Sequence, residues 1–330
     1  MPIRSGKELS QGNNQGFKSS KYFKRVLLWT VASVVAGIAG LWIWSGFYRK
    51  ADHTATIVSA RSRLVHTEEK LLPDSAGKKR IAFELTDERG RRTRGELHLP
   101  AGHSSKLPGL LILGGKGTGA RAAGLIRLTR PAALCSMDYP AFETKKPTLR
   151  GSPAFITGMR EASLDAVGGT FNVLDYLCAR GEVDTSRITV VGASLGVPFA
   201  VISSSLDQRV NALVLVYGAG DLDHLIDWNL RRKLKFTPAR LLVSRILSTA
   251  AAPFEPSAYI GRLAPRPLLM VNSRQDERIP EPCIRYLFSN AGQPKTIRWL
   301  ATAHIHPTNR ELIDSLTETV SGWLEENGLL

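Results

Sequence analysis

Mostly apolar runs recur along the chain after Pro108 and are separated by segments long enough for helices. Continuous apolar runs are typical of strands that are buried on both faces of a parallel sheet. The runs are Leu110–Leu113, Ala132–Met137, Ile188–Val191, Leu213–Val216, Leu268–Val271 and Ile297–Leu300. The segment Met159–Ala179 repeats apolar residues at helical spacing, and Leu312–Trp323 does the same near the C-terminus.

Before Pro108 the pattern predicts a hairpin. Ile81–Leu85 and Arg94–Leu99 flank the turn residues Asp87–Gly90. A hairpin that leads into alternating strands and helices predicts an α/β fold, with a mostly parallel twisted sheet and helices on both faces.

The segment between Val216 and Leu268 is too long for a single crossover. It contains two predicted helices, His224–Leu234 and Ala239–Ala250. We therefore expect a helical cap insertion at about residues 218–262, over a site at the strand ends. Its cluster of basic residues is interpreted as a solvated helix face.

The most hydrophobic stretch is Val26–Tyr48, which contains no charged residue. As a helix it would be about 34 Å long, enough to cross a bilayer with some tilt. Aromatic residues gather at both of its ends, as in the interfacial belts of membrane proteins. No small-residue cleavage site follows it, which favours an uncleaved single-pass anchor over a cleaved signal peptide and a secreted protein.

Basic residues before this stretch outweigh those directly after it, which predicts a cytoplasmic N-terminus and a globular part outside the cytoplasm. Residues 1–25 are expected to form a disordered basic tail, 26–48 the transmembrane anchor, 49–78 a linker and 79–330 the globular domain.

The net charge of +15 is unevenly distributed, because residues 1–50 carry +7 of it. The globular part shows no zinc-ligand spacing, RNA-binding aromatic signature or basic block, so the charge does not indicate nucleic-acid binding. The three cysteines, Cys135, Cys178 and Cys283, are far apart and odd in number. They predict neither a disulfide framework nor a metal cluster.

The run Ile188–Val191 leads directly into Gly192-Ala193-Ser194-Leu195-Gly196, and a helix-compatible segment follows. A Gly-x-Ser-x-Gly sequence between a strand and a helix is typical of a nucleophile elbow. Gly192 and Gly196 would let the strand and the helix approach closely, and the sharp turn would expose the hydroxyl of Ser194.

With these residues the chain resembles the α/β-hydrolase family, and within it the dienelactone-hydrolase and prolyl-oligopeptidase-like branch. The resemblance covers about residues 80–326. The residues that carry it are Val183–Ile188, the elbow Gly192–Gly196, the segment Pro265–Leu269 leading to Asp276, and the late His304. It implies an α/β-hydrolase fold with the chain order serine, acid, histidine.

A serine nucleophile needs a base within hydrogen-bond reach and a third group that orients the base. Ser194 is the candidate nucleophile, His304 the candidate base and Asp276 the candidate acid. The alternatives are Glu277, Asp221 and Asp223 for the acid and His306 for the base.

The oxyanion hole is expected to use the backbone N–H of Leu195, the residue after the nucleophile. A second N–H should come from the glycine-rich loop Gly114–Gly119. Many members of the family have His-Gly here, whereas this chain has two glycines, so Gly115, Lys116 and Gly117 remain open as donors. A phosphate-binding loop is the alternative, but the Lys-Ser/Thr ending of that motif is missing.

Together these features predict a membrane-anchored serine hydrolase that cleaves a small-molecule carboxylic ester or thioester through an acyl-enzyme, with no metal and no organic cofactor. A peptidase or amidase with the same triad remains an alternative, as does a non-catalytic membrane-anchored binding protein. Residues 26–48 are the expected membrane contact, nucleic acid is not expected as a partner, and the oligomeric state is left open.

Overall fold

The computed structural model describes residues 14–75, 77–102, 105–140 and 152–330, and the chain divides into the units Met1–Ala51 and Asp52–Leu330. In the first unit, helix α1 spans Asn14–Lys50. Its part Tyr22–Lys50 has a mean hydropathy of 2.1, so it is long and apolar enough to cross a membrane, although a signal sequence would have the same properties.

Of the tail expected over residues 1–25, residues 1–13 lie outside the residues that the structure describes. From Asn14 onward the chain is helical and continuous with the apolar segment, so the expectation of disorder is wrong for residues 14–25. An apolar helix can extend into a polar flank, because adding a residue to an existing helix forms a hydrogen bond without a new nucleation step.

Among the described residues, the second unit contains one nine-stranded sheet in the order β1-β2-β3-β5-β4-β6-β7-β8-β9. The strands are β1 Leu64–Ser75, β2 Lys78–Asp87, β3 Arg92–Pro100, β4 Leu107–Leu113, β5 Ala133–Met137, β6 Val183–Ala193, β7 Ala212–Val216, β8 Leu268–Ser273 and β9 Lys295–Leu300. In this sheet order, the pairs β1–β2, β2–β3 and β3–β5 are antiparallel. All neighbouring pairs from β5 through β4 to β9 are parallel. The predicted mixed sheet and each of its predicted strands are therefore confirmed.

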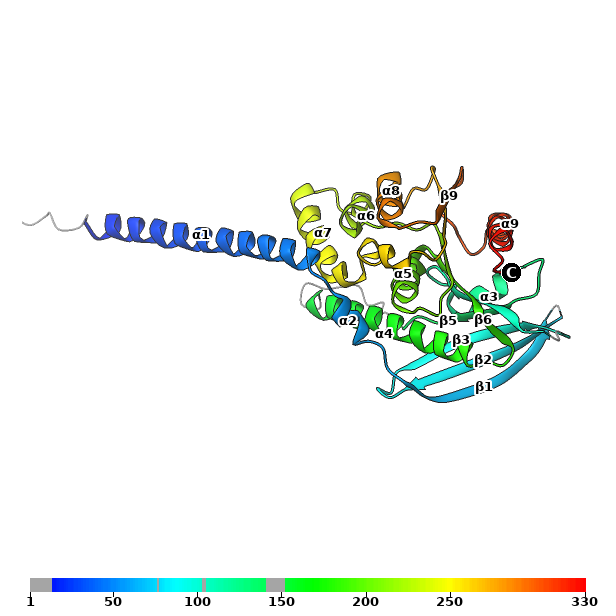
Figure 1. Ribbon diagram of the computed structural model, residues 1–330. Coiled ribbons are helices and arrows are strands. Elements are labelled where there is room, and N and C mark those ends of the chain that lie inside the picture. Colours follow the sequence, from blue (N-terminus) through cyan, green and yellow to red (C-terminus); the bar gives the residue numbers. More distant parts are fainter. Residues whose placement is uncertain (1–13, 76, 103–104, 141–151) are drawn as a thin grey trace, which may run out of the picture. The chain divides into compact units, whose positions relative to one another are not determined.

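Helices α3 to α8 lie between successive parallel strands along the chain, α2 precedes β1 and α9 follows β9 (Figure 1). The α-helices are α2 Thr54–Val58, α3 Ala122–Leu125, α4 Ser152–Cys178, α5 Val197–Leu206, α6 Leu222–Leu230, α7 Thr237–Ala251, α8 Glu281–Asn290 and α9 Arg310–Glu326. Short 3₁₀ helices are η1 Gly119–Arg121, η2 Ser194–Gly196, η3 Ala252–Phe254, η4 Pro256–Ala258 and η5 Ile260–Leu263.

Helices cover both faces of the sheet. Successive side chains of a strand point to opposite faces, so a single strand can contact helices on both sides. Ile112 of β4 lines an apolar crevice together with Leu316 of α9. Gly109, on the opposite face of the same strand, lies next to Leu177 of α4. Helices α9 and α4 therefore shield the two faces of the parallel strands from water (Figure 1).

The linker expected over residues 49–78 is wrong. This segment contains helix α2 and strand β1, and β1 pairs with β2 along most of its length. Strand β1 is the edge of the sheet and its side chains are mostly exposed, so its sequence lacks the apolar alternation that reveals a half-buried strand. Tyr176 of α4 donates a 2.6 Å hydrogen bond to Glu69 and ties this edge to the core.

The insertion between β7 and β8 is helical, as predicted, and consists of α6, α7 and the 3₁₀ helices η3 to η5. Helix α6 packs on the loop after β8, where Trp228 Nε1 donates to the carbonyl of Glu277 and Asn229 Nδ2 donates to that of Arg278. Helix α7 packs against α6 and α4.

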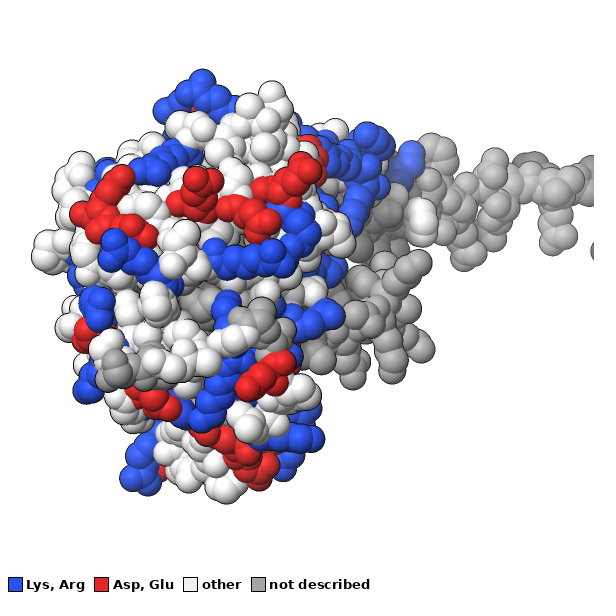
Figure 2. Space-filling model, turned by 90° about the vertical axis from the view of Figure 1, so that its right-hand side faces the viewer, with Lys and Arg blue, Asp and Glu red and all other residues white. Residues whose placement is uncertain are grey.

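Charged side chains of both signs lie next to one another on the face of the molecule in Figure 2. Among the described residues, ion pairs join such charges, for example Arg209 with Asp207 and Arg180 with Glu182.

Candidate active site

Ser194 lies on the sharp turn between β6 and helix α5, at the carboxyl end of the parallel strands. Its φ of 50° is in the left-handed region, which costs a residue with a side chain about 1–2 kcal/mol. A Cβ at Gly196 would clash with the carbonyl oxygen of Leu113, and one at Gly192 would lie 2.5 Å from Cβ of Ala200. The strained serine therefore depends on two positions that accept only glycine.

His304 lies between Ser194 and Asp276. Its Nε2 is 2.9 Å from Oγ of Ser194, and its Nδ1 is 2.7 Å from Oδ2 of Asp276. The histidine and aspartate side chains are almost completely buried. Because an ionised carboxylate can only accept, the proton lies on Nδ1, and Nε2 is left to accept a proton from the serine.

The other oxygen of Asp276 is also held. Oδ1 accepts the backbone N–H groups of Arg278 at 2.7 Å and Ile279 at 3.1 Å. Both oxygens of the carboxylate are therefore fixed in direction, which holds the plane of the imidazole toward Ser194.

Hydrogen bonds between two separate loops place the histidine. The backbone N–H of His304 donates to Oε2 of Glu277 at 3.0 Å, and this bond lowers the pKa of the Glu277 carboxyl. Ser273 at the end of β8 accepts the N–H of Thr302 at 3.0 Å and donates to its carbonyl. The loop after β9 is thus fastened to the loop that carries the acid.

Tyr217 supports the same loop from the end of β7. Its hydroxyl lies 2.5 Å from Oγ1 of Thr302, and its ring meets the His304 ring edge-on at 5.3 Å between centroids. Burial raises the pKa of Tyr217, so the phenol stays protonated and able to donate. No motif marks this residue in the sequence, because its role depends only on its place at a strand end.

A cavity of about 510 Å³ opens beside Ser194 and His304. It is lined mainly by apolar side chains, with Lys116, Arg278 and His306 as charged or titratable members. The apolar lining residues are Ile112, Ala122, Leu125, Ile126, Ala193, Ile305, Pro307 and Ile313.

None of the lining residues that the structure describes belongs to the insertion at 218–262, so the expectation that this insertion covers the site is wrong. The insertion instead packs on α4 through α7 and, through Trp228 of α6, on the loop after β8 that carries Asp276 (the acid loop).

The loop Gly114–Thr118 lines the cavity opposite Ser194. Gly115 lies against the serine, since a Cβ there would be 3.5 Å from Cβ of Ser194. Tyr139 donates to the carbonyl of Gly114 at 2.8 Å, and the Thr118 hydroxyl donates to that of Gly115 at 2.7 Å. These bonds occupy two carbonyl groups of the loop and fix its conformation beside the serine.

The remaining predicted site residues lie as follows. Leu195 is the second residue of η2, and N–H groups in the first turn of a helix have no acceptor within it. Lys116 and Gly117 belong to the cavity-lining loop. Of the rival residues, Glu277 accepts a hydrogen bond from the backbone N–H of His304. His306 lines the cavity and contacts Thr308. Asp221 faces His224 and caps α6, away from His304.

Comparisons with known proteins agree on the fold. No protein-family model matches the chain, and no curated protein matches it in sequence. Acetyl xylan esterase 1 from Thermoanaerobacterium sp. JW/SL YS485 superposes with a TM-score of 0.60 at 17% identity, over 81% of this chain and 90% of the esterase. The acetyl xylan esterase from Paenibacillus sp. R4 has a TM-score of 0.57 at 19% identity, over 83% and 93%.

A cold-adapted esterase from an Arctic intertidal metagenomic library is also similar, with a TM-score of 0.54 at 15% identity over 78% of this chain and 97% of the esterase. Together with the strand order, the helices on both faces and the serine turn, these similarities show that the chain has the α/β-hydrolase fold. At such low identity they do not assign a substrate.

Proposed function

We propose that this protein is a serine hydrolase that cleaves a carboxylic ester or thioester. The observation that carries the proposal is the unbroken contact from Ser194 Oγ through His304 to Asp276, at the wall of an apolar cavity. A serine hydroxyl needs such a base and orienting carboxylate to become nucleophilic. The similarity of the fold to acetyl xylan esterases and to a cold-adapted esterase supports an ester substrate.

In the proposed reaction, Ser194 Oγ attacks the carbonyl carbon of the substrate while His304 Nε2 takes the hydroxyl proton. The imidazolium that forms is stabilised by Asp276. His304 then donates the proton to the leaving alcohol or thiol, which leaves an acyl-serine. A water molecule, deprotonated by His304, attacks the acyl-serine, and breakage of the serine ester bond releases the acid and restores Ser194.

The negative oxygen of each tetrahedral intermediate needs N–H donors. We assign one to Leu195, whose N–H is in the first turn of η2, and the second to the loop of Gly115, Lys116 and Gly117. The position of Gly115 supports this assignment, because its Cα lies close to Ser194: a Cβ added there would be 3.5 Å from Cβ of the serine. The apolar cavity favours an uncharged acyl or alcohol group.

The chain order Ser194, Asp276, His304 is that of the α/β-hydrolase family. We also propose membership of the dienelactone-hydrolase and prolyl-oligopeptidase-like branch, on the sequence resemblance of Val183–Ile188 and Pro265–Leu269. We further propose that Tyr22–Lys50 anchors the protein in a membrane by a single span, with the N-terminus in the cytoplasm and the hydrolase outside. Alkaline extraction and protease protection of intact cells test the anchor. Recovery of a soluble chain without residues 1–50 would show a cleaved signal instead.

Labelling with a fluorophosphonate tests the nucleophile. The full chain in detergent and the control variant Ser289→Ala, which alters an exposed serine of α8, should both be labelled, and Ser194→Ala should not. Equal labelling of Ser194→Ala would overturn the proposal. A panel of p-nitrophenyl esters, acyl thioesters and anilides then separates esterase from amidase activity.

A further inference from the structure

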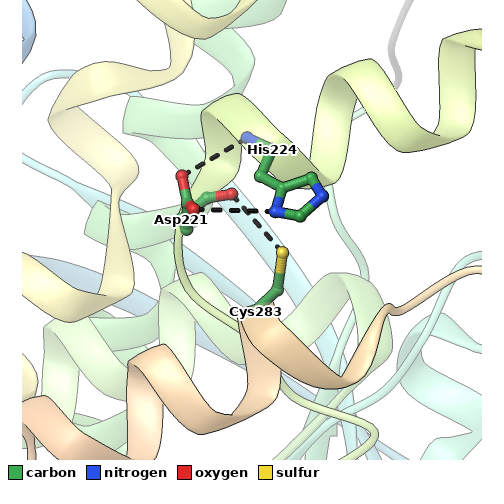
Figure 3. Close-up of side chains that lie close together, drawn as sticks. All are labelled: Asp221, His224 and Cys283. Atoms are coloured by element: carbon green, nitrogen blue, oxygen red, sulfur yellow. Dashed lines mark hydrogen bonds and ion pairs between the residues drawn. The ribbon is translucent and has the colours of Figure 1, made fainter.

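A second group of reactive side chains lies outside the catalytic cavity, where helices α6 and α8 meet (Figure 3). Asp221 precedes α6, His224 is in its first turn, and Cys283 comes from the first turn of α8. One ligand atom of each residue lies within 4.8 Å of the ligand atoms of the other two. The three side chains point toward a common space in Figure 3.

The arrangement does not resemble a second nucleophile with its base. Cys283 is completely buried, so a carbonyl substrate has no access to its sulfur. The carboxylate of Asp221 is 3.9 Å from Nδ1 of His224, too far for a hydrogen bond. The sulfur has only a weak contact, at 3.9 Å, with the backbone carbonyl of Asp221. The groups converge on one point instead of forming a relay.

Convergence is the geometry of a metal site. Zinc binds sulfur at about 2.3 Å and nitrogen or oxygen at about 2.0–2.2 Å, so its tetrahedral ligands lie roughly 3.3–3.8 Å apart. The observed separations, up to 4.8 Å, need a contraction of about 1 Å. Asp221 and His224 can supply it by rotating, since both side chains are about one-third exposed.

The electrostatics of the pocket also favour a cation. Glu255 lies beside the cluster and accepts the N–H groups of Asp221 and Leu222. Burial, together with the charges of Asp221 and Glu255, raises the pKa of the Cys283 thiol to about 12. Without a metal the sulfur therefore keeps its proton. A divalent cation would displace that proton into solvent and offset the negative charge of the two carboxylates.

We propose that Asp221, His224 and Cys283 bind a divalent transition-metal ion of the zinc type, with water as the fourth ligand. The mixed oxygen, nitrogen and sulfur donors suit zinc, whereas calcium and magnesium prefer oxygen alone. The ion would join the start of α6 to α8.

The position of the ion gives it a structural role. Helix α6 already holds the acid loop through Trp228 and Asn229, which donate to the carbonyls of Glu277 and Arg278. Helix α8 begins directly after that loop, at Glu281. A metal that joins the two helices would restrict the loop from both sides and raise the free energy of unfolding of the insertion relative to the sheet.

Metal binding by the full chain in detergent tests this proposal without reference to hydrolysis. After chelator treatment, the protein is titrated with Zn²⁺ or with Co²⁺, whose bond to a thiolate produces a near-ultraviolet charge-transfer band. We expect one ion per chain, the cobalt–thiolate band, and a rise in Tm of roughly 5 °C with saturating Zn²⁺.

The variants Cys283→Ser and His224→Asn should each weaken binding roughly tenfold or more, and Cys283→Ser should abolish the thiolate band. If Cys283→Ser fails to fold, His224→Asn still tests the site, because a substitution at the partly exposed His224 should leave the fold intact. The matched controls Cys178→Ser and His66→Asn should behave as wild type. Absence of the thiolate band in wild type, or an equal Tm rise in His224→Asn, would refute the site.

Discussion

The two sides of the candidate active site are held in different ways. The serine side is built from five consecutive residues, Gly192–Gly196, and is fixed by steric exclusion around two glycines. The acid–base side combines Asp276 and His304, which are 28 residues apart in the chain and are fixed by hydrogen bonds between loops. Steric exclusion tolerates no added atom, whereas a hydrogen-bond network can lose one member and partly retain its geometry.

This contrast predicts that substitutions on the two sides fail differently. A change at a glycine of the serine turn should alter folding itself. A change in the loop network should leave the protein folded and reduce the precision with which His304 is placed. Only direct replacement of a group that exchanges or orients the proton should cause a very large loss of rate.

The largest effect is expected for Asp276→Asn. The amide would donate to Nδ1 and move the imidazole proton to Nε2, where His304 can no longer accept from Ser194. We expect kcat to fall about 10⁴-fold with little change in Tm. Hydrolysis of a p-nitrophenyl ester measures this, with Asp314→Asn on the exposed side of α9 as control. A loss of less than tenfold would place the orienting acid elsewhere.

The next largest effect is expected for Gly196→Ala. The new methyl group would meet the backbone oxygen of Leu113, which cannot rotate away. We expect the free energy of unfolding to fall by about 3 kcal/mol or more. The control is Gly322→Ala in α9, where a Cβ has no neighbour within 4 Å and should stabilise the helix by up to about 1 kcal/mol. Denaturant unfolding of both variants decides the comparison, and similar stabilities would contradict the steric account.

A smaller effect is expected for Tyr217→Phe, which removes the hydroxyl that meets Thr302. Tyr217 is a positioning residue, so kcat should fall roughly tenfold, about 1.4 kcal/mol in the activation barrier, while KM stays nearly constant. The exposed Tyr286→Phe in α8 is the matched control. If KM rises and kcat does not change, Tyr217 shapes the substrate pocket and does not position His304.

The smallest effect is expected for Glu277→Gln. The folded-state pKa of Glu277 is lowered, so its charge stabilises the fold above the unfolded pKa of about 4.3, and this contribution is lost as the pH falls through the folded pKa. The variant should be less stable at pH 7 by about 0.5 kcal/mol, because the side chain is well exposed. The difference from wild type should shrink as the pH falls from 7 toward 3. Tm of wild type and of Glu277→Gln is measured across this pH range, with Glu318→Gln as control. A Tm difference between wild type and Glu277→Gln that grows at low pH would contradict the stabilising effect of the Glu277 charge.

Much of the fold could be predicted from the sequence. The strands β4, β5, β7 and β8 are mostly apolar because both of their faces are covered, and this pattern needs no tertiary information. Strand β1 gave no such signal, because an exposed edge strand is polar on both faces. The covering role expected of the insertion was also wrong, since a helical pattern shows that an apolar face exists and does not show where it packs.

For the candidate site, the sequence by itself determined the serine turn and narrowed the acid and base to a few residues near strand ends. It could do so because the turn is local, and because parallel strands bring their carboxyl ends to one edge of the sheet. Only the tertiary structure decided that His304 and not His306 contacts Ser194. It alone placed Cys283 beside Asp221 and His224, although the cysteine spacing had excluded a metal cluster. Contacts between residues far apart in the chain depend on how helices pack, and sequence spacing carries no information about that.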